Sequence, residues 1–164
     1  MVNYNRLAGK LKEDLTGFSE KISKGMKYPA KKFILQMVYG ILESNTVHLS
    51  EIARSLEEKT SLKKTMDRLS RNLSLFNGKE NITKNYTRLV KKESNEKSSV
   101  IIIDNSDITK TYSKKMEALS DVRDGSTGEI KKGYLTIEAA VLSNGSKMPL
   151  PVYEKVFSVA EKGF

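Results

Sequence analysis

The sequence contains no cysteine, no tryptophan and one histidine among its 164 residues. Without cysteine, the chain forms no disulfide, binds no metal through thiolates and offers no thiol nucleophile. Because His48 is the single histidine, a histidine-rich zinc site is excluded. We assign His48 no chemical role. Long apolar runs are also absent, so we expect no membrane-spanning helix, and the N-terminus lacks the apolar core of a signal peptide. These absences predict a cytoplasmic protein that does not bind membranes.

Acidic residues are scarce in the first part of the chain. The whole sequence has 29 Lys and Arg against 20 Asp and Glu, a net charge of +9. Residues 1–98 hold 20 of the cations and 11 of the acids, so the entire excess lies there. Within residues 60–92, nine cations face only Asp67 and Glu80. Such a patch attracts polyanions, most simply nucleic acid, although a solvated lysine-rich surface has the same charge count.

The hydrophobic pattern changes near residue 98. Before it, apolar residues recur at helical spacing; after it, β-branched runs and turn signals dominate. The expected helices cover about 4–24, 29–43, 50–56, 61–75 and 80–94. The expected strands cover 100–103, 134–142 and 148–157, with a loop at 121–128 and an Asn-Gly hairpin turn at 144–145. The sequence thus predicts an α+β protein, with a helical domain over 1–98 and a strand domain over 99–164.

Residues 46–73 contain a short helix, a polar turn and a longer basic helix. Ser50 is the expected N-cap of the first helix, and Thr60 or Ser61 that of the second. The expected buried stripe of the second helix is Leu62, Met66, Leu69 and Leu73. Its opposite face carries Lys63, Lys64, Thr65, Arg68 and Arg71. This pattern is typical of a helix-turn-helix, here about 49–75, whose second helix enters the DNA major groove. The alternative is an ordinary helical hairpin whose basic face is exposed to solvent and has no binding function.

The apolar run Val100–Ile103 predicts a short buried strand, and Asp104 follows it directly. A carboxylate at the end of a rigid strand is a suitable ligand for Mg²⁺ or Mn²⁺. Asp107, three residues on, is the second candidate for that role. An aspartate at a strand end is also common as a turn or cap residue, so this feature alone does not decide the chemistry.

Two segments of the second part, VIIIDNSDITK (100–110) and SDVRDGSTGEIKKGYLTIEAAVLSNGSKMPLPVYEKVFS (120–158), resemble insertion-sequence transposases of the DDE class. The text LSEIARSL…TSLKKTMDRLSRNL resembles their DNA-binding region. The resemblance implies a ribonuclease H-like core, of which three antiparallel strands are present, and double-stranded DNA of transposon ends as the partner. It makes Asp104 the first catalytic acid and a ligand of Mg²⁺ or Mn²⁺. It also places Lys110, Arg123 and Lys132 near DNA phosphates.

The sequence departs from that family because no acid after Asp104 stands in the context of the second Asp or the Glu. We therefore expect a truncated, DNA-binding fragment of a transposase that neither cleaves DNA alone nor binds the metal tightly. The complete protein would catalyse metal-dependent DNA strand cleavage and transfer. The alternative is a non-catalytic helix-turn-helix protein, such as a regulator or a domesticated remnant. A protein that binds RNA or another acidic partner is a third hypothesis, and a homodimer stays open.

Overall fold

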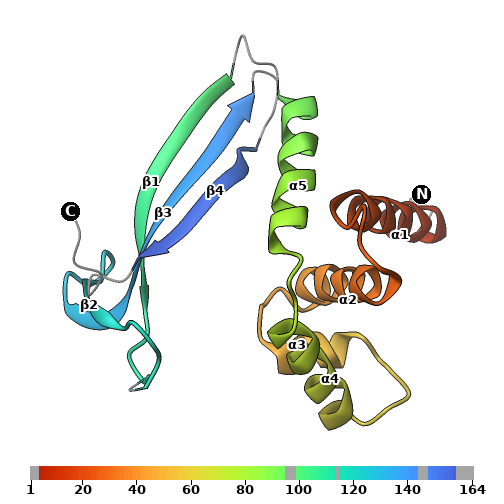
Figure 1. The fold of residues 1–164 in the computed structure, drawn as a ribbon, viewed down its shortest axis with the longest axis horizontal. Helices are drawn as coiled ribbons and strands as arrows, with labels where there is room; N and C mark the ends of the chain where they lie inside the picture. Colours follow the sequence, from red (N-terminus) through yellow and green to blue (C-terminus); the bar gives the residue numbers. More distant parts are fainter. Residues whose placement is uncertain (1–3, 95–98, 114, 144–147, 158–164) are drawn as a thin grey trace. The chain divides into compact units, whose positions relative to one another are not determined.

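The computed structural model describes residues 4–94, 99–113, 115–143 and 148–157. In these ranges the chain is an α+β protein, as the sequence predicts, with five helices and an antiparallel sheet of four strands where three were expected (Figure 1). It divides into two compact units, residues 1–88 and 89–164. The boundary between them falls inside the last helix, ten residues before the change in sequence character.

The first unit consists of helices joined by short turns. The helices are α1 (Tyr4–Ile22), α2 (Tyr28–Ser44), α3 (Leu49–Ser55), α4 (Leu62–Ser74) and α5 (Lys79–Glu93). Pro29 stands in the first turn of α2, where its missing N–H costs no hydrogen bond. Asn45 follows α2 in the left-handed conformation (φ 50°), and Glu57 adopts the same region (φ 45°) between α3 and α4. Asparagine tolerates this conformation better than most residues, which explains why α2 ends at Ser44.

The core of the helical unit lies where α2, α3 and α4 meet. Its fully buried members are Phe33, Ile52, Ala53 and Leu69. Partly buried hydrophobic residues surround them, namely Met37, Ile41, Leu49, Leu56, Met66 and Phe76. The rings of Phe33 and Phe76 lie 5.7 Å apart at a tilt of 53°, a favourable geometry for an aromatic pair. Helix α3 is therefore fixed by tertiary packing, since seven residues are too few for a stable isolated helix.

The buried face of α4 differs from the predicted stripe. Leu69 is fully buried, but Leu62 and Leu73 are 38% and 50% exposed. Thr65, which we expected to face solvent, is 2% exposed. The helix is rotated so that Thr65 faces the interior, where its hydroxyl has polar partners from the preceding turn. The N-cap of α3 is His48 and not the predicted Ser50, whereas the N-cap of α4 is Ser61, one of the two predicted residues. Neither makes a side-chain cap hydrogen bond.

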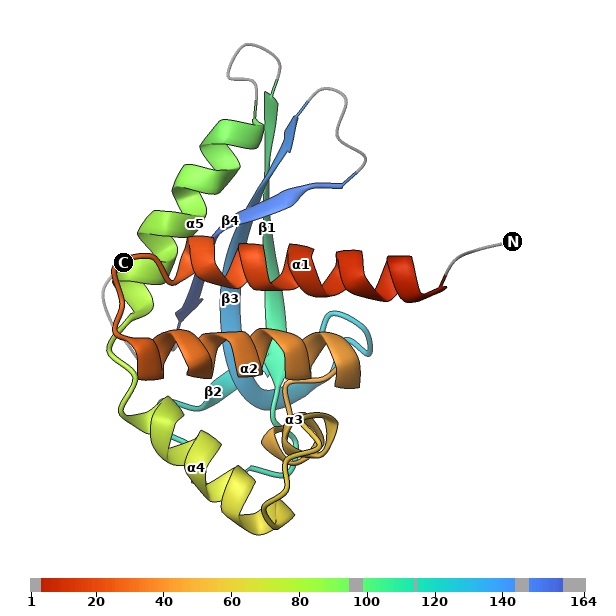
Figure 2. The same ribbon diagram turned by 90° about the vertical axis from the view of Figure 1, so that its right-hand side faces the viewer.

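A buried asparagine anchors α5 to the end of α1. The side-chain amide of Asn85 donates to the carbonyl oxygens of Ile22 (3.0 Å) and Lys24 (2.9 Å). These carbonyls belong to the last residue of α1 and the turn after it, where helical hydrogen bonding ends. Figure 2 shows α1 and α2 running side by side in this unit, and the two helices are in contact. The amide of Asn85 thus fixes the first half of α5 on the helical unit.

The second unit is built around one long strand. The strands are β1 (Ser99–Thr109), β2 (Ser120–Arg123), β3 (Ile130–Ser143) and β4 (Leu150–Phe157). Strand β3 pairs along one side with β1, and along the other with β2 and β4, always antiparallel. A bulge at Ala139/Ala140 shifts the register between β3 and β4. The predicted Asn-Gly turn at 144–145 lies outside the described residues.

Three predictions about the strands were wrong. Val100–Ile103 does not form a buried strand, since its four side chains are 44–71% exposed. The strand also continues to Thr109, so Asp104 lies at its middle and not at its end. In addition, residues 121–123 of the expected loop belong to β2 (Ser120–Arg123). In the described ranges, no helix is both long enough and apolar enough to cross a membrane.

We expect Gly40→Ala to destabilise the helical unit. A Cβ atom at Gly40 would lie 2.5 Å from Cγ2 of Ile52 and 3.4 Å from its Cα, so α2 and α3 would have to separate. Overpacking of this kind costs about 1–3 kcal/mol. Urea unfolding followed by the helical circular dichroism signal measures the loss. The matched control is Gly17→Ala in α1, where a Cβ meets nothing within 4 Å and should add about 0.5–1 kcal/mol of helix stability. Equal effects of the two substitutions would contradict this packing.

Candidate functional site

Helix α4 presents cations to solvent on the face away from the core. Lys63, Lys64 and Arg71 are exposed, and none of them forms an ion pair with any described residue. Lys64 and Arg71 are seven residues apart and so lie on the same side of the helix. Asp67 is the one acid in α4. The face therefore has a net positive charge whose partners are water or an external anion.

The two other residues predicted to contact DNA belong to an internal network instead. The guanidinium of Arg68 donates to both carboxylate oxygens of Glu58 (2.7 and 2.8 Å) and to Oε1 of Gln36 (2.8 Å). The hydroxyl of Thr65 donates to Oε2 of Glu58 at 3.0 Å. Gln36 completes the network by donating from Nε2 to Glu58 at 2.9 Å. The structure thus gives Thr65 and Arg68 a structural role: they tie α4 to α2 and to the turn after α3.

Glu58 is the centre of this network and lies in the turn between α3 and α4. Partial burial raises the pKa of its carboxyl, but the hydrogen bonds from Arg68 and Thr65 and the charge of Arg68 outweigh this effect. The net result is a pKa below the usual value for glutamate. Glu58 and Arg68 are ten residues apart, so no local spacing rule indicates their pairing. The sequence analysis therefore missed both Glu58 and Gln36.

In the sheet, Asp104 forms a row of acids with two neighbouring strands. The register places Asp104 opposite Glu138, and Glu138 opposite Glu154. Directly opposed residues of antiparallel strands project from the same face. All three line a shallow hollow of about 280 Å³, together with Ile102, Ala139, Ala140, Pro151 and Tyr153. In the described part of the chain, however, no three acidic or histidine side chains are close enough together to hold a metal ion.

Asp107 lies on the opposite face of the sheet from Asp104. Side chains alternate along a strand, so residues three apart point in opposite directions. Oδ1 of Asp107 accepts a hydrogen bond from the backbone N–H of Gly125 (2.9 Å), which ties β1 to the turn between β2 and β3. Asp104 instead accepts one from the backbone N–H of Asn105 and is otherwise exposed. The two candidate metal ligands therefore cannot serve one site.

The cations of the β2–β3 hairpin are mostly neutralised by nearby acids. Lys131 pairs with the buried Asp124 at 2.6 Å, and Lys132 pairs with Asp121 at 2.9 Å. The ammonium of Lys131 lowers the pKa of Asp124 far below its usual range, with help from hydrogen bonds from Ser126. Nε of Arg123 donates to the carbonyl of Gly128. These pairs stiffen the hairpin and leave less free charge for phosphate binding than α4 offers.

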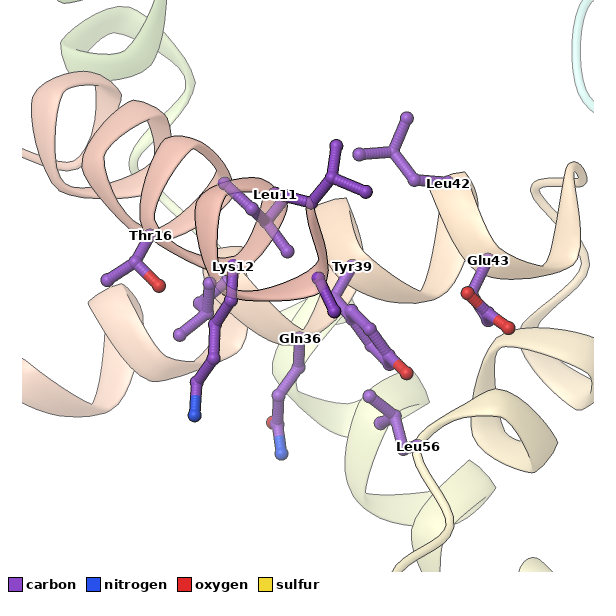
Figure 3. Close-up of a pocket in the computed structure, with 11 residues that line it drawn as sticks. Leu11, Lys12, Thr16, Gln36, Tyr39, Leu42, Glu43 and Leu56 are labelled. Atoms are coloured by element: carbon purple, nitrogen blue, oxygen red, sulfur yellow. The ribbon is translucent and has the colours of Figure 1, made fainter. Parts of the chain in front are cut away.

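An apolar hollow of about 750 Å³ lies between α1 and α2 in the helical unit. Figure 3 shows Leu11 of α1 and Leu42 of α2 on its rim, with Tyr39, Gln36 and Leu56 along the wall. The hollow carries no cluster of acids, cations or nucleophiles that could perform a reaction. It meets the network described above at Gln36.

Comparisons of the chain with models of known protein families, with curated proteins and with solved structures find no match.

We expect the helical unit to lose stability in mild acid through Glu58. The pKa of Glu58 is lower in the folded than in the unfolded chain. Its contribution to the free energy of unfolding is therefore complete above the pKa of the unfolded chain, about 4.3, and is lost as the pH falls through the pKa of the folded chain. The urea concentration at the midpoint of unfolding should therefore decrease as the pH is lowered from 5 to 3. Glu58→Gln should cost about 1 kcal/mol at pH 7 and flatten the pH profile. An unchanged slope in this variant would show that other carboxylates cause the acid sensitivity.

Proposed function

We propose that this chain binds double-stranded DNA through α3 and α4, acting as a helix-turn-helix in which α4 enters the major groove. The observation that carries the proposal is the division of cations on α4. Arg68 is bound internally, while Lys63, Lys64 and Arg71 are exposed and unpaired within the described residues. Lysine and arginine side chains of this kind provide phosphate contacts, and arginine also reads guanine in the major groove.

The network around Glu58 supports this function by fixing the angle between the two helices. A recognition helix must be presented rigidly, because flexible attachment adds an entropic cost to binding. Here the turn after α3, the body of α4 and Gln36 of α2 share one set of hydrogen bonds. The close contact of Gly40 with Ile52 holds α3 against α2 in the same way. We infer that α4 keeps its orientation when it meets DNA.

We further propose that the chain is the N-terminal part of a DDE-type transposase with a ribonuclease H-like core. The support is the resemblance in sequence, together with a hydrophobic strand that carries Asp104 and pairs antiparallel with the long strand β3. The metal implied by this family does not fit the described residues, since Asp104, Glu138 and Glu154 do not form a ligand set. We therefore assign no catalytic step to this chain.

A non-catalytic DNA-binding protein is the second candidate function. It would use the same α4 surface, with Asp104 as a structural residue. The observation that favours it is the environment of Asp104, which is exposed and makes one hydrogen bond, to the adjacent backbone N–H. A carboxylate prepared for metal binding is usually positioned by several surrounding groups.

We expect Lys64→Ala/Arg71→Ala to weaken DNA binding and its dependence on salt. Each lost phosphate contact reduces the slope of log K against log[salt] by about 0.9, so the double variant should be shallower by about 2. Fluorescence anisotropy with a 30-base-pair duplex across a salt series measures this. The matched control is Lys10→Ala/Lys12→Ala, which removes two exposed charges from α1. If the control matches the α4 variant, or the wild type does not bind at low salt, the proposal fails.

We expect no strand cleavage when the chain is incubated with supercoiled DNA and Mg²⁺ or Mn²⁺. One exposed carboxylate cannot hold the pair of ions that in-line phosphoryl transfer uses. Gel electrophoresis of the plasmid provides the readout. Nicking that disappears in Asp104→Asn, but persists in Asp107→Asn, would contradict this expectation and would establish catalysis at Asp104.

A further inference from the structure

Helix α5 carries a row of cations along the face opposite to its buried side. Lys84, Arg88, Lys91 and Lys92 are all exposed. Spacings of four, three and one place them within one side of the helix. The side away from Lys84, Arg88 and Lys91 is formed by the half-buried residues Ile82, Tyr86 and Leu89, with the buried Asn85 and Val90 at its two borders. The helix is therefore amphipathic, and its exposed face is predominantly positively charged.

These cations have no ion-pair partner in the part of the chain that the structure describes. This is not general in the molecule, because Arg54, Arg68, Lys131 and Lys132 all pair with acids. Like charges three or four residues apart destabilise a helix. The repulsion among them reduces helix stability, and it is partly offset by Glu80, four residues before Lys84, and by the helix dipole, which favours Lys91 and Lys92 in the last turn. An external polyanion would remove the remaining repulsion.

The row is presented on a firm support. The side-chain amide of Asn85, one residue after Lys84, is buried and donates to the carbonyl oxygens of Ile22 and Lys24. It also donates to Oδ1 of Asn81 at 2.7 Å, one turn earlier in α5. The rotation of α5 about its axis is therefore fixed on the helical unit. A fixed rotation keeps the cationic side outward.

We propose that α5 is a second DNA-contacting element, which binds the phosphate backbone and does not read bases. This inference rests on the proposed function, because it takes the same duplex as the ligand. From Lys84 to Lys92 the helix rises about 12 Å, which matches three to four nucleotide steps of about 3.4 Å along one strand. Lysine-rich rows of this kind position a protein on DNA, whereas sequence discrimination comes from groups in the groove. The α4 and α5 surfaces thus have different tasks.

The test is the triple variant Lys84→Ala/Arg88→Ala/Lys91→Ala in the full chain, with the 30-base-pair duplex and a salt series. The slope of log K against log[salt] should become shallower by about 2–3, and affinity at 50 mM salt should fall at least tenfold. The matched control removes three exposed lysines of α1, Lys10→Ala/Lys12→Ala/Lys21→Ala, and should change the slope by less than one. Circular dichroism checks the fold, and the glutamine version of the triple variant replaces the alanine version if helicity falls.

The outcomes separate this inference from the proposed function. If the α4 variant loses slope and the α5 variant matches its control, α5 does not contact DNA although the proposed function stands. If the wild type binds no duplex, the proposed function itself fails. A wild type that binds vesicles containing anionic lipid, with binding lost in the α5 variant and DNA affinity unchanged, would assign the row to a lipid surface and overturn the inference.

Discussion

The DNA-binding surface that we propose depends on one carboxylate, that of Glu58. It lies in the turn between α3 and α4, and accepts hydrogen bonds from Arg68 and Thr65 of α4 and from Gln36 of α2. Removing it would leave a guanidinium, a hydroxyl and an amide without their shared acceptor. Burying polar groups without partners is costly, so the network favours one angle between α3 and α4. The exposed cations of α4 acquire their fixed direction from this internal pairing.

The sequence was sufficient to predict the secondary-structure classes, because these depend on local periodicity. Apolar residues at helical spacing and β-branched runs predicted the α+β class, the helices and three of the four strands, whereas β2 was missed. The rotation of α4 could not be predicted in the same way. Hydrophobicity favoured Leu62 and Leu73 for the interior, but Thr65 is buried because Glu58 supplies a partner for its hydroxyl. Only the tertiary structure shows that the carboxylate of Glu58, in the turn between α3 and α4, is directed toward Thr65 and Arg68.

The strand unit illustrates a different limit. Val100–Ile103 has the composition of a strand covered on both faces, yet its four side chains are 44–71% exposed. The composition of a segment indicates whether a strand would be stable in the interior, whereas its actual burial depends on the elements that pack against it. The opposite directions of Asp104 and Asp107, by contrast, follow from strand alternation alone once both are known to lie in β1. Because β1 was predicted to end before Asp104, the sequence analysis treated the two residues as exchangeable ligands.

The two units therefore differ in how they use charge. In the hairpin of the sheet, Lys131 and Lys132 are paired with Asp124 and Asp121 and stabilise a turn. In α4 and α5 the cations other than Arg68 stay exposed and form no ion pair among the described residues. This division supports the proposal that α4 and α5 bind nucleic acid. The sequence resemblance to a transposase core lies in the strand unit and includes Asp104.

The most direct test of this account is a nuclear magnetic resonance titration of the ¹⁵N-labelled chain with a short DNA duplex. The account predicts that backbone shifts concentrate on Lys63, Lys64 and Arg71 of α4 and on the cationic side of α5. It also predicts that the guanidinium resonance of Arg68 stays in place, because that group remains bound to Glu58. Shifts confined to the β2–β3 hairpin, or release of Arg68 from Glu58 to the DNA, would contradict the account.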